Sequence, residues 1–204
     1  MRFPLALMTA VVALVAAMAC TDSRSGTPRP APDAGMTSTT TTVSDPRPRP
    51  VELAGVDPCK LLSDQQLAHF GVLGSLLPGE ARPPSVLVGA PGCTASSFEL
   101  QYGYLVIASS ELGLPEYLSQ VRGNPTRHHI SVDGFPAVEE EGLASEPESG
   151  SGECYVNVDV ADGQLLQVQF SQIGADPDRR LAIEALCAKA REVAEAALTT
   201  LQGG

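Results

Sequence analysis

The hydrophobic positions of the chain fall into three zones with different spacing. Residues 5–18 are almost continuously apolar, residues 21–50 hold almost no large apolar side chain, and apolar residues recur periodically from position 51 onward. The first zone has the length of a signal-peptide core and is short for a membrane span. The second zone is rich in Pro and Thr and cannot bury a core, so the folded domain is predicted to begin at residue 51.

Alternating apolar and polar residues in the third zone predict two β-hairpins. Asp133-Gly134 and Asp162-Gly163 each separate two alternating segments, and such dipeptides favour tight hairpin turns. Val156, Val158 and Val160 should therefore face one side of a sheet. The four hairpin strands are expected at residues 127–132, 135–140, 154–160 and 164–170.

Two further strands are indicated at residues 93–100 and 102–109, where the second alternates Tyr104, Val106 and Ala108. Residues 74–92 are rich in Gly and Pro and are expected to form a loop. Residues 114–121 indicate a short helix.

Helix signals occur near both ends of the third zone. Asp57-Pro58, followed by the capping-box spacing of Ser63 and Gln66, predicts a short helix that stops at Gly71. Asp176-Pro177 is expected to cap a long helix that runs to about Leu201. Its buried stripe is expected to be Ile183, Cys187, Ala190, Ala194, Ala197 and Leu201.

This order of elements predicts an α+β domain over residues 51–204. An antiparallel sheet of about six strands would be packed by the short N-terminal helix and the long C-terminal helix.

Charge and composition limit the classes of function that the protein can have. The 204 residues carry a net charge of -11, and only 13 are Lys or Arg, so no basic face is available for a phosphate backbone and nucleic acid is excluded as a partner. Arg strongly outnumbers Lys, and Ala, Gly and Pro are abundant, a bias typical of a GC-rich bacterial genome.

The N-terminal sequence predicts that the protein is located at the cell membrane. Met1-Arg2 precedes the apolar run, and Ala17-Met18-Ala19-Cys20 resembles the bacterial lipobox. We therefore expect residues 1–19 to be a signal peptide, Cys20 to be lipidated, and residues 20–50 to be a disordered tether on the extracytoplasmic face. The alternative is a plain signal peptide cut after the Ala-x-Ala-like site, which would leave Cys20 as an ordinary thiol.

The number of cysteines favours the lipid. Five Cys is an odd number for an exported chain, and lipidation of Cys20 leaves an even set. Cys59 would open the first helix and Cys187 would lie on the last, while Cys93 and Cys154 would each begin a strand. We expect disulfides between Cys59 and Cys187 and between Cys93 and Cys154, one of the three connectivities that four Cys allow.

Several motifs together suggest a known family. They are Asp57-Pro58-Cys59 with Leu61-Leu62, Gly92-Cys93, the hairpin 132–137, Cys154 before a Val-rich strand, and Cys187 on an Ala-rich helix. With the lipobox and the tether, these features resemble actinobacterial lipoproteins that are grouped as a family of unknown function. The similarity covers about residues 57–201 and implies an outer-leaflet lipoprotein, but it implies no reaction.

Histidines and acidic clusters are the candidate metal ligands. His128 and His129 are adjacent strand residues that point to opposite faces, so they cannot chelate one ion together. The run Glu139-Glu140-Glu141 lacks the spacing of a Ca²⁺ loop and is expected to be a solvated acidic edge. Asp176 and Asp178 are interpreted as helix-capping residues. The sequence therefore predicts no metal site and no cofactor.

Catalytic motifs are equally scarce. The chain contains neither a nucleophile-elbow motif nor a phosphate-binding loop motif, so no catalytic residue is assigned. Tyr102, Tyr104 and Tyr117 could line a ligand pocket, but packing in the core is the favoured interpretation.

The sequence thus predicts a lipid-anchored module of the cell envelope that binds an envelope protein or a small ligand. An envelope enzyme without a recognisable motif remains the alternative, and it would need a cleft in which titratable side chains converge. A carrier of an apolar molecule is a third possibility, and it would need an enclosed pocket beneath the sheet.

Overall fold

The computed structural model describes residues 47–72, 76–97, 100–123, 125–142, 152–172, 178 and 180–203. The chain divides into two units, Met1–Thr41 and Thr42–Gly204, and every described residue belongs to the second. The expected signal peptide, Cys20 and nearly all of the expected tether lie outside the described residues. Among the described residues, no helix is both long and apolar enough to cross a membrane.

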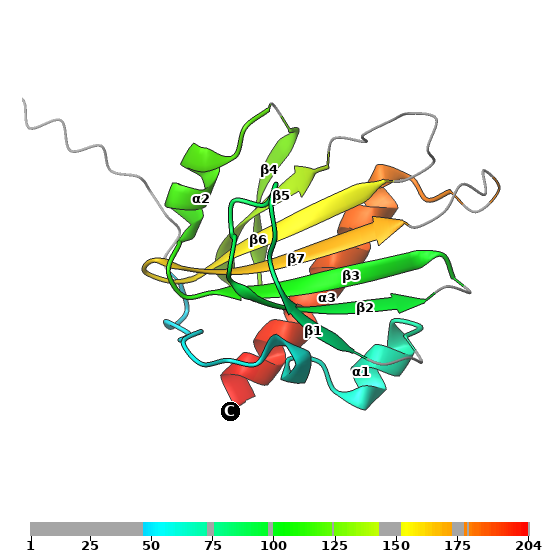
Figure 1. The fold of residues 1–204 in the computed structure, drawn as a ribbon, viewed down its shortest axis with the longest axis horizontal. Coiled ribbons are helices and arrows are strands. Elements are labelled where there is room, and N and C mark those ends of the chain that lie inside the picture. Colours follow the sequence, from blue (N-terminus) through cyan, green and yellow to red (C-terminus); the bar gives the residue numbers. More distant parts are fainter. Residues whose placement is uncertain are drawn as a thin grey trace, which may run out of the picture. The chain divides into compact units, whose positions relative to one another are not determined.

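The core of the fold is a seven-stranded antiparallel sheet in the order β1-β2-β3-β7-β6-β5-β4 (Figure 1). Its strands are β1 Leu77–Glu80, β2 Pro91–Ser97, β3 Tyr102–Ser109, β4 Arg127–Val132, β5 Phe135–Glu141, β6 Glu153–Ala161 and β7 Gln164–Gln172. Both predicted hairpins are confirmed as β4–β5 and β6–β7. Asp133 and Gly134 take φ angles of 48° and 82°, which is why this turn needs residues that tolerate the left-handed region.

The sheet has one strand more than expected, because β1 lies inside the segment that was predicted to be a loop. All four β1 residues are exposed, and the strand contains Pro78 and Gly79. It pairs only with β2, so it is a short edge strand. A strand with no buried face shows no hydrophobic alternation that could reveal it in the sequence.

Helices occupy the expected places with shifted bounds. The N-terminal helix is split into the 3₁₀ turn η1 Pro58–Lys60 and helix α1 Asp64–His69, and the Ser63–Gln66 capping box is present. The helix α2 Leu114–Gln120 is confirmed. The helix α3 Ile183–Gly203 begins after the predicted cap at Asp176-Pro177, and that cap lies outside the described residues.

The two faces of the sheet are covered differently. Helix α3 lies across one face (Figure 1) and buries Val156, Val158 and Val160 completely. The buried stripe of α3 includes Cys187, Ala190, Ala194 and Ala197 as expected, and adds Leu186, Val193 and Leu198. Ile183 and Leu201, also expected in the stripe, are only half-buried because they lie near the two ends of the helix. A smaller cluster on the opposite face joins Ile107 and Leu165 of the sheet to Leu114 and Tyr117 of α2.

All four cysteines of the domain form disulfides, but the predicted pairing was wrong. Cys59 bonds to Cys93, which ties η1 to β2, and Cys154 bonds to Cys187, which ties β6 to α3. Strands β2 and β6 are separated by β3 and β7, which places them roughly 14 Å apart at the usual strand spacing. The bonded Cα atoms are only 5.1 Å apart, so Cys93 cannot reach Cys154.

Candidate functional site

A cleft of about 1370 Å³ lies on the face of the sheet opposite α3. One wall is the segment 79–86, and the other is formed by α2 together with Val121, Arg122 and Pro125. The floor is formed by β2, β3, β7 and β6 and the end of β5. Helix α2 and the segment after β1 therefore leave the middle of this face open instead of covering it.

The strand register arranges the floor as two parallel rows of side chains. The first row consists of Glu140, Tyr155, Gln169, Leu105 and Thr94. The second row consists of Val138, Asn157, Gln167, Ile107 and Gly92. Residues paired across neighbouring strands point to the same face, so the floor is mainly polar over β5, β6 and β7 and apolar over β3.

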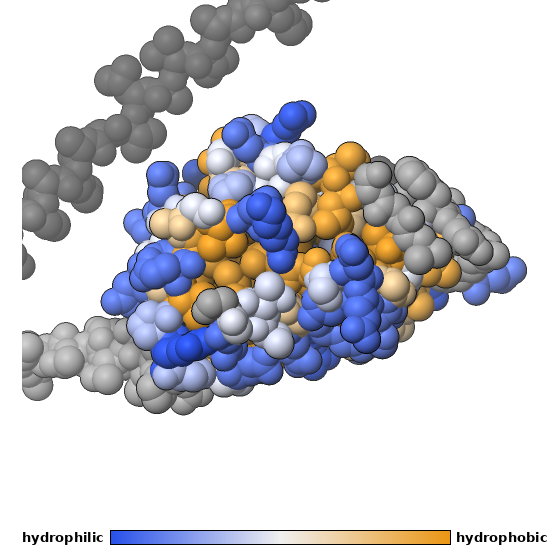
Figure 2. Space-filling view, turned by 90° about the horizontal axis from the view of Figure 1, so that it is seen from below, coloured by the Kyte–Doolittle hydropathy of each residue, from blue (hydrophilic) through white to orange (hydrophobic). Residues whose placement is uncertain are grey.

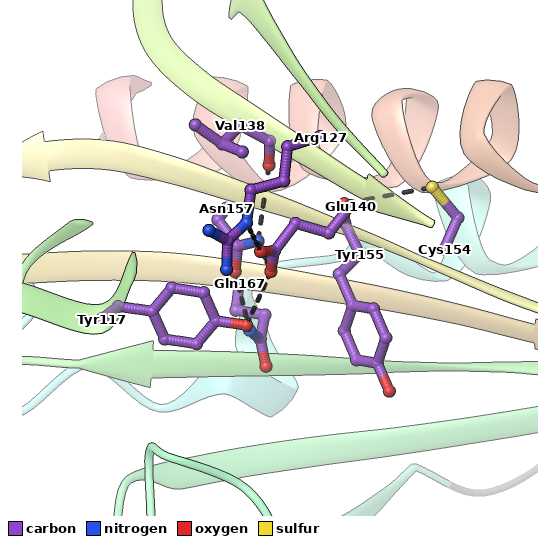
Figure 3. A network of polar contacts seen from close by, with 8 residues as sticks. All are labelled: Tyr117, Arg127, Val138, Glu140, Cys154, Tyr155, Asn157 and Gln167. Carbon is purple, nitrogen blue, oxygen red and sulfur yellow. Dashed lines mark hydrogen bonds and ion pairs between the residues drawn. The ribbon is translucent and has the colours of Figure 1, made fainter. Parts of the chain in front are cut away.

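Glu140 is the centre of a buried network of polar contacts (Figure 3). Its side chain is 3% exposed, and Arg127 Nε donates to its Oε1 at 2.5 Å. The hydroxyl of Tyr117 donates to Oε2 at 2.9 Å, and Nδ2 of Asn157 donates to the same oxygen at 3.1 Å. The carboxylate is thus held by one cation and two neutral donors.

The direction of the hydrogen bonds in this network fixes how Gln167 presents its amide. Because a carboxylate only accepts, Tyr117 and Asn157 must donate to Glu140, and their oxygens remain acceptors. Nε2 of Gln167 donates to both, at 3.0 Å to Tyr117 Oη and 2.7 Å to Asn157 Oδ1. Figure 3 shows the amide oxygen of Gln167 turned away from these partners, and within the described part of the chain it has no hydrogen-bond donor.

Glu153 places a second carboxylate in the cleft. It is half-buried and accepts a hydrogen bond from Gln169 Nε2 at 2.8 Å. A Cβ atom on residue 142 would lie 2.1 Å from Cγ of Glu153, so Gly142 provides the space through which this side chain extends. Within the described ranges, no Lys or Arg comes within 4.0 Å of the Glu153 carboxylate.

The tyrosines of the cleft are held as neutral phenols. Burial is the main cause that raises the pKa of Tyr117 above its ordinary value, and the charge of Glu140 adds to it. Burial also raises the pKa of Tyr155, with the nearby Glu153 carboxylate as the next cause. Both hydroxyls therefore remain protonated and act as hydrogen-bonding groups at neutral pH.

The expected solvated acidic edge at Glu139-Glu140-Glu141 was wrong. Strand β5 lies inside the sheet between β4 and β6, so it has no free edge. Glu139 and Glu140 are 8% and 2% exposed, and Glu139 forms an ion pair with Arg191 of α3 at 3.0 Å. Alternation along β5 sends these two carboxylates to opposite faces of the sheet, where each meets a different arginine.

The two histidines lie on opposite sides of β4, as predicted, since His128 pairs with Glu139 and His129 with Val138. Both are exposed, and neither lines the cleft. Among the described residues, Glu139, Cys154 and Cys187 bring potential metal-ligand atoms within 4.8 Å of one another. The two sulfurs are bonded to each other and the Glu139 carboxylate is paired with Arg191, so this group offers no thiolate to a metal ion.

The favoured assignment of the three tyrosines to the core is confirmed. Tyr104 and Tyr117 are buried members of the two hydrophobic clusters, and Tyr102 packs against the larger cluster. Tyr117 also lines the cleft. The sequence analysis did not identify Tyr155, Asn157 and Gln167, because alternating polar residues in a strand usually face solvent. The one available signal was that these positions continue the alternation of the buried valines onto a second face.

The nucleophilic side chains that line the described part of the cleft are serines and a threonine. No His, Cys or Asp occurs among the described residues that line it. Oγ of Ser85 accepts a hydrogen bond from the Leu87 amide, and Oγ of Ser119 donates to the Glu116 carbonyl. Neither serine is therefore paired with a general base.

Hydrophobic residues also reach the surface elsewhere. Figure 2 shows them gathered in the middle of the view from below, between hydrophilic residues. The large exposed hydrophobic side chains of the described residues are Leu77, Val88 and Leu100.

Comparison with known proteins gives a family match. A family model described as "Protein of unknown function (DUF3558)" matches residues 15–200. No curated protein and no solved structure matches the chain.

Proposed function

This chain belongs to the DUF3558 family of proteins of unknown function, and on that premise we propose that it is a lipid-anchored extracytoplasmic protein whose cleft binds a small ligand. The observation that carries the proposal is the floor of the cleft, where hydrogen-bonding side chains lie beside apolar ones. Ligand sites are typically concave and combine apolar surface with a few polar groups in fixed positions. Glu140, Asn157 and Gln167 are fixed in this way by their mutual hydrogen bonds.

Binding is favoured over catalysis because the buried titratable groups around Glu140 are already paired or protonated. Arg127 pairs with Glu140, and burial keeps Tyr117 and Tyr155 protonated. The open, half-polar cleft also argues against a carrier that would enclose an entirely apolar molecule.

The proposed location is supported by the cysteines and the N-terminus. The two disulfides use Cys59, Cys93, Cys154 and Cys187, which leaves Cys20 as the single cysteine for a lipid. Disulfides persist in oxidising compartments outside the cytoplasm.

The proposed ligand-binding function is tested by identifying the molecule that is bound in the cleft. The full chain would be expressed in a GC-rich actinobacterial host, extracted gently from membranes and analysed by native mass spectrometry. We expect a bound small molecule that disappears in Thr94→Trp, because Thr94 is an exposed residue of the cleft floor and a Trp side chain would fill the space above it.

Ser131→Trp is the matched control, since Ser131 is an exposed strand residue that does not line the cleft. It should retain the ligand. Equal occupancy of both variants would show that the molecule binds elsewhere and would contradict the proposal. Conversion of the recovered molecule by fresh protein would instead identify an enzyme.

The anchor is tested by Cys20→Ala. The wild-type chain should partition with membranes and gain the mass of acyl chains, whereas the variant should be released or remain unprocessed. Unchanged membrane retention of the variant would rule out Cys20 as the anchor.

A further inference from the structure

We propose that the cleft selects a cationic amphiphile, with an N–H-bearing cation held by Glu153, an apolar body over Leu105 and Ile107, and Gln167 as a separate acceptor on the same floor. This inference rests on the proposed function and adds the chemical class of the ligand. It is carried by the polarity of the floor, by the Glu153 carboxylate, which has no Lys or Arg partner among the described residues, and by the adjacent apolar strand.

The first step is the free acceptor of Gln167. This residue is 4% exposed, and its amide nitrogen is committed to Tyr117 and Asn157. The amide oxygen is left as an acceptor that solvent in the cleft can reach, so a ligand that displaces this water must replace its hydrogen bond. A ligand that brings N–H groups would satisfy it, whereas a carboxylate would place a second acceptor against it.

The second step is the contrast between Glu153 and three buried carboxylates that each have an arginine partner. Glu139, Glu140 and Asp159 are paired with Arg191, Arg127 and Arg47, at 3.0, 2.5 and 3.1 Å. Within the part of the chain that the structure describes, Glu153 has an amide donor and no such cation. A charge that is removed from water is stabilised by an opposite charge, which here a ligand can supply.

Two arginines also line the cleft, but they lie on its walls and not on its floor. Arg82 and Arg122 line the cleft and are exposed, so their guanidinium groups remain solvated. Glu153 and Gln167 belong to strands of the floor, and Glu153 is half-buried there. A charged group that binds on the floor therefore meets a carboxylate that is less hydrated than the two arginines of the walls.

The third step is the position of the apolar surface. Leu105 and Ile107 of β3 pair with Gln169 and Gln167 of β7, so the apolar residues lie one strand away from the polar ones. Ile107 is 2% exposed and Leu105 is half-buried, and both line the cleft. Beyond them lies Gly92 of β2, which has no side chain. The floor therefore stays open toward β2, where an apolar body can lie.

The experiment compares four ten-carbon probes: decylammonium, decyltrimethylammonium, decanol and decanoate. They share the apolar chain and differ in charge and in hydrogen-bond donors. The full chain would carry Cys20→Ala, so that no acyl chain of its own competes for the cleft. Gln120→Trp supplies a fluorescent reporter, because this exposed residue lines the cleft and the protein contains no other Trp.

We expect decylammonium to bind at least tenfold more tightly than decanoate and several-fold more tightly than decyltrimethylammonium, which has no N–H. Glu153→Gln should weaken decylammonium about tenfold and leave decanol within twofold. Glu80→Gln is the matched control, because Glu80 is an exposed carboxylate on the wall of the same cleft, and it should change each affinity by less than twofold.

Two results would overturn the inference in distinguishable ways. If decanoate or decanol binds as tightly as decylammonium, or if Glu153→Gln leaves decylammonium unchanged, the cationic class is wrong while ligand binding in the cleft stands. If none of the four probes binds and Thr94→Trp changes nothing, both this inference and the proposed ligand-binding function are wrong.

Discussion

The Tyr117 hydroxyl of α2 donates a hydrogen bond to Oε2 of Glu140 on β5 at 2.9 Å, and both groups are buried. This contact fastens the helix that forms one wall of the cleft to the sheet that forms its floor. Tyr117→Phe removes it and leaves Glu140 with one donor fewer. We expect the free energy of unfolding to fall by about 1–2 kcal/mol in denaturant titrations, because the lost bond joins a hydroxyl to a charged group.

Tyr104→Phe is the control for this prediction. The hydroxyl of Tyr104 is buried and has no hydrogen-bond partner among the described residues. Its removal should leave stability unchanged or slightly raised, since a buried group without a partner is destabilising. Equal losses in the two variants would show that the Tyr117–Glu140 contact adds nothing.

The ion pair between Arg127 and Glu140 should respond asymmetrically to mutation. The Arg127 side chain is 32% exposed and can return to water when its partner is removed, whereas Glu140 is 3% exposed. Arg127→Met leaves a buried carboxylate without its cation and should cost about 3 kcal/mol. Glu140→Gln should cost less, because the amide oxygen can still accept from Tyr117 and Asn157.

Denaturant unfolding of both single variants and of the double variant measures this difference. The double variant should lose less stability than the sum of the single variants, since the two residues interact directly. Additive losses would contradict a direct interaction between the two side chains.

The local signals in the sequence predicted most elements of this fold. Asp133-Gly134 and the capping box of Ser63 and Gln66 act over four residues or fewer, so each could be read without knowing its surroundings. The α3 stripe was predicted for the same reason, because Cys187 and Ala190 repeat at helical spacing. β1 was missed because its residues have no buried side.

The disulfide pairing and the cleft depend on contacts between segments that are distant in the sequence. Placing Cys187 beside Cys154 requires the strand order and the direction in which α3 crosses β6, and neither leaves a local pattern. The polar floor was missed because Asn157 and Gln167 look like solvent-facing strand residues. Only the side chains and walls around them make these amides buried.

The two disulfides should stabilise the domain unequally. They close chain segments of 34 and 33 residues, so the loss of chain entropy on cross-linking is nearly the same, about 4 kcal/mol for each. Cys154 and Cys187 are 0% and 2% exposed, whereas Cys59 is half-buried. Cys154→Ala with Cys187→Ala should therefore cost more than Cys59→Ala with Cys93→Ala, because it also leaves a cavity in the core.

Thermal unfolding of the two double variants tests this order, and peptide mapping without reduction tests the connectivity. The expected linked peptides join Cys59 to Cys93 and Cys154 to Cys187. Equal stability of the variants would mean that the cavity beside α3 closes by repacking.

The four tyrosines of the chain should ionise late in an alkaline titration. The folded protein raises the pKa of Tyr102, Tyr104, Tyr117 and Tyr155 above the ordinary value of 10.0, in each case mainly through burial. The unfolded chain releases these protons at about pH 10, whereas the folded chain keeps them. Stability that these phenols contribute is thus fully present below pH 10 and is lost as the pH rises above it.

Absorbance at 295 nm follows phenolate formation directly, because the protein contains no Trp. We expect Tyr117 and Tyr155 to ionise only together with the loss of folded structure, recorded in parallel by circular dichroism. Tyr117→Phe should make the decline of stability above pH 10 shallower, since one group that takes up a different number of protons in the two states is gone. Full ionisation of all four phenols near pH 10 in a chain that is still folded would show that the cleft admits hydroxide and that its tyrosines are not held as neutral donors.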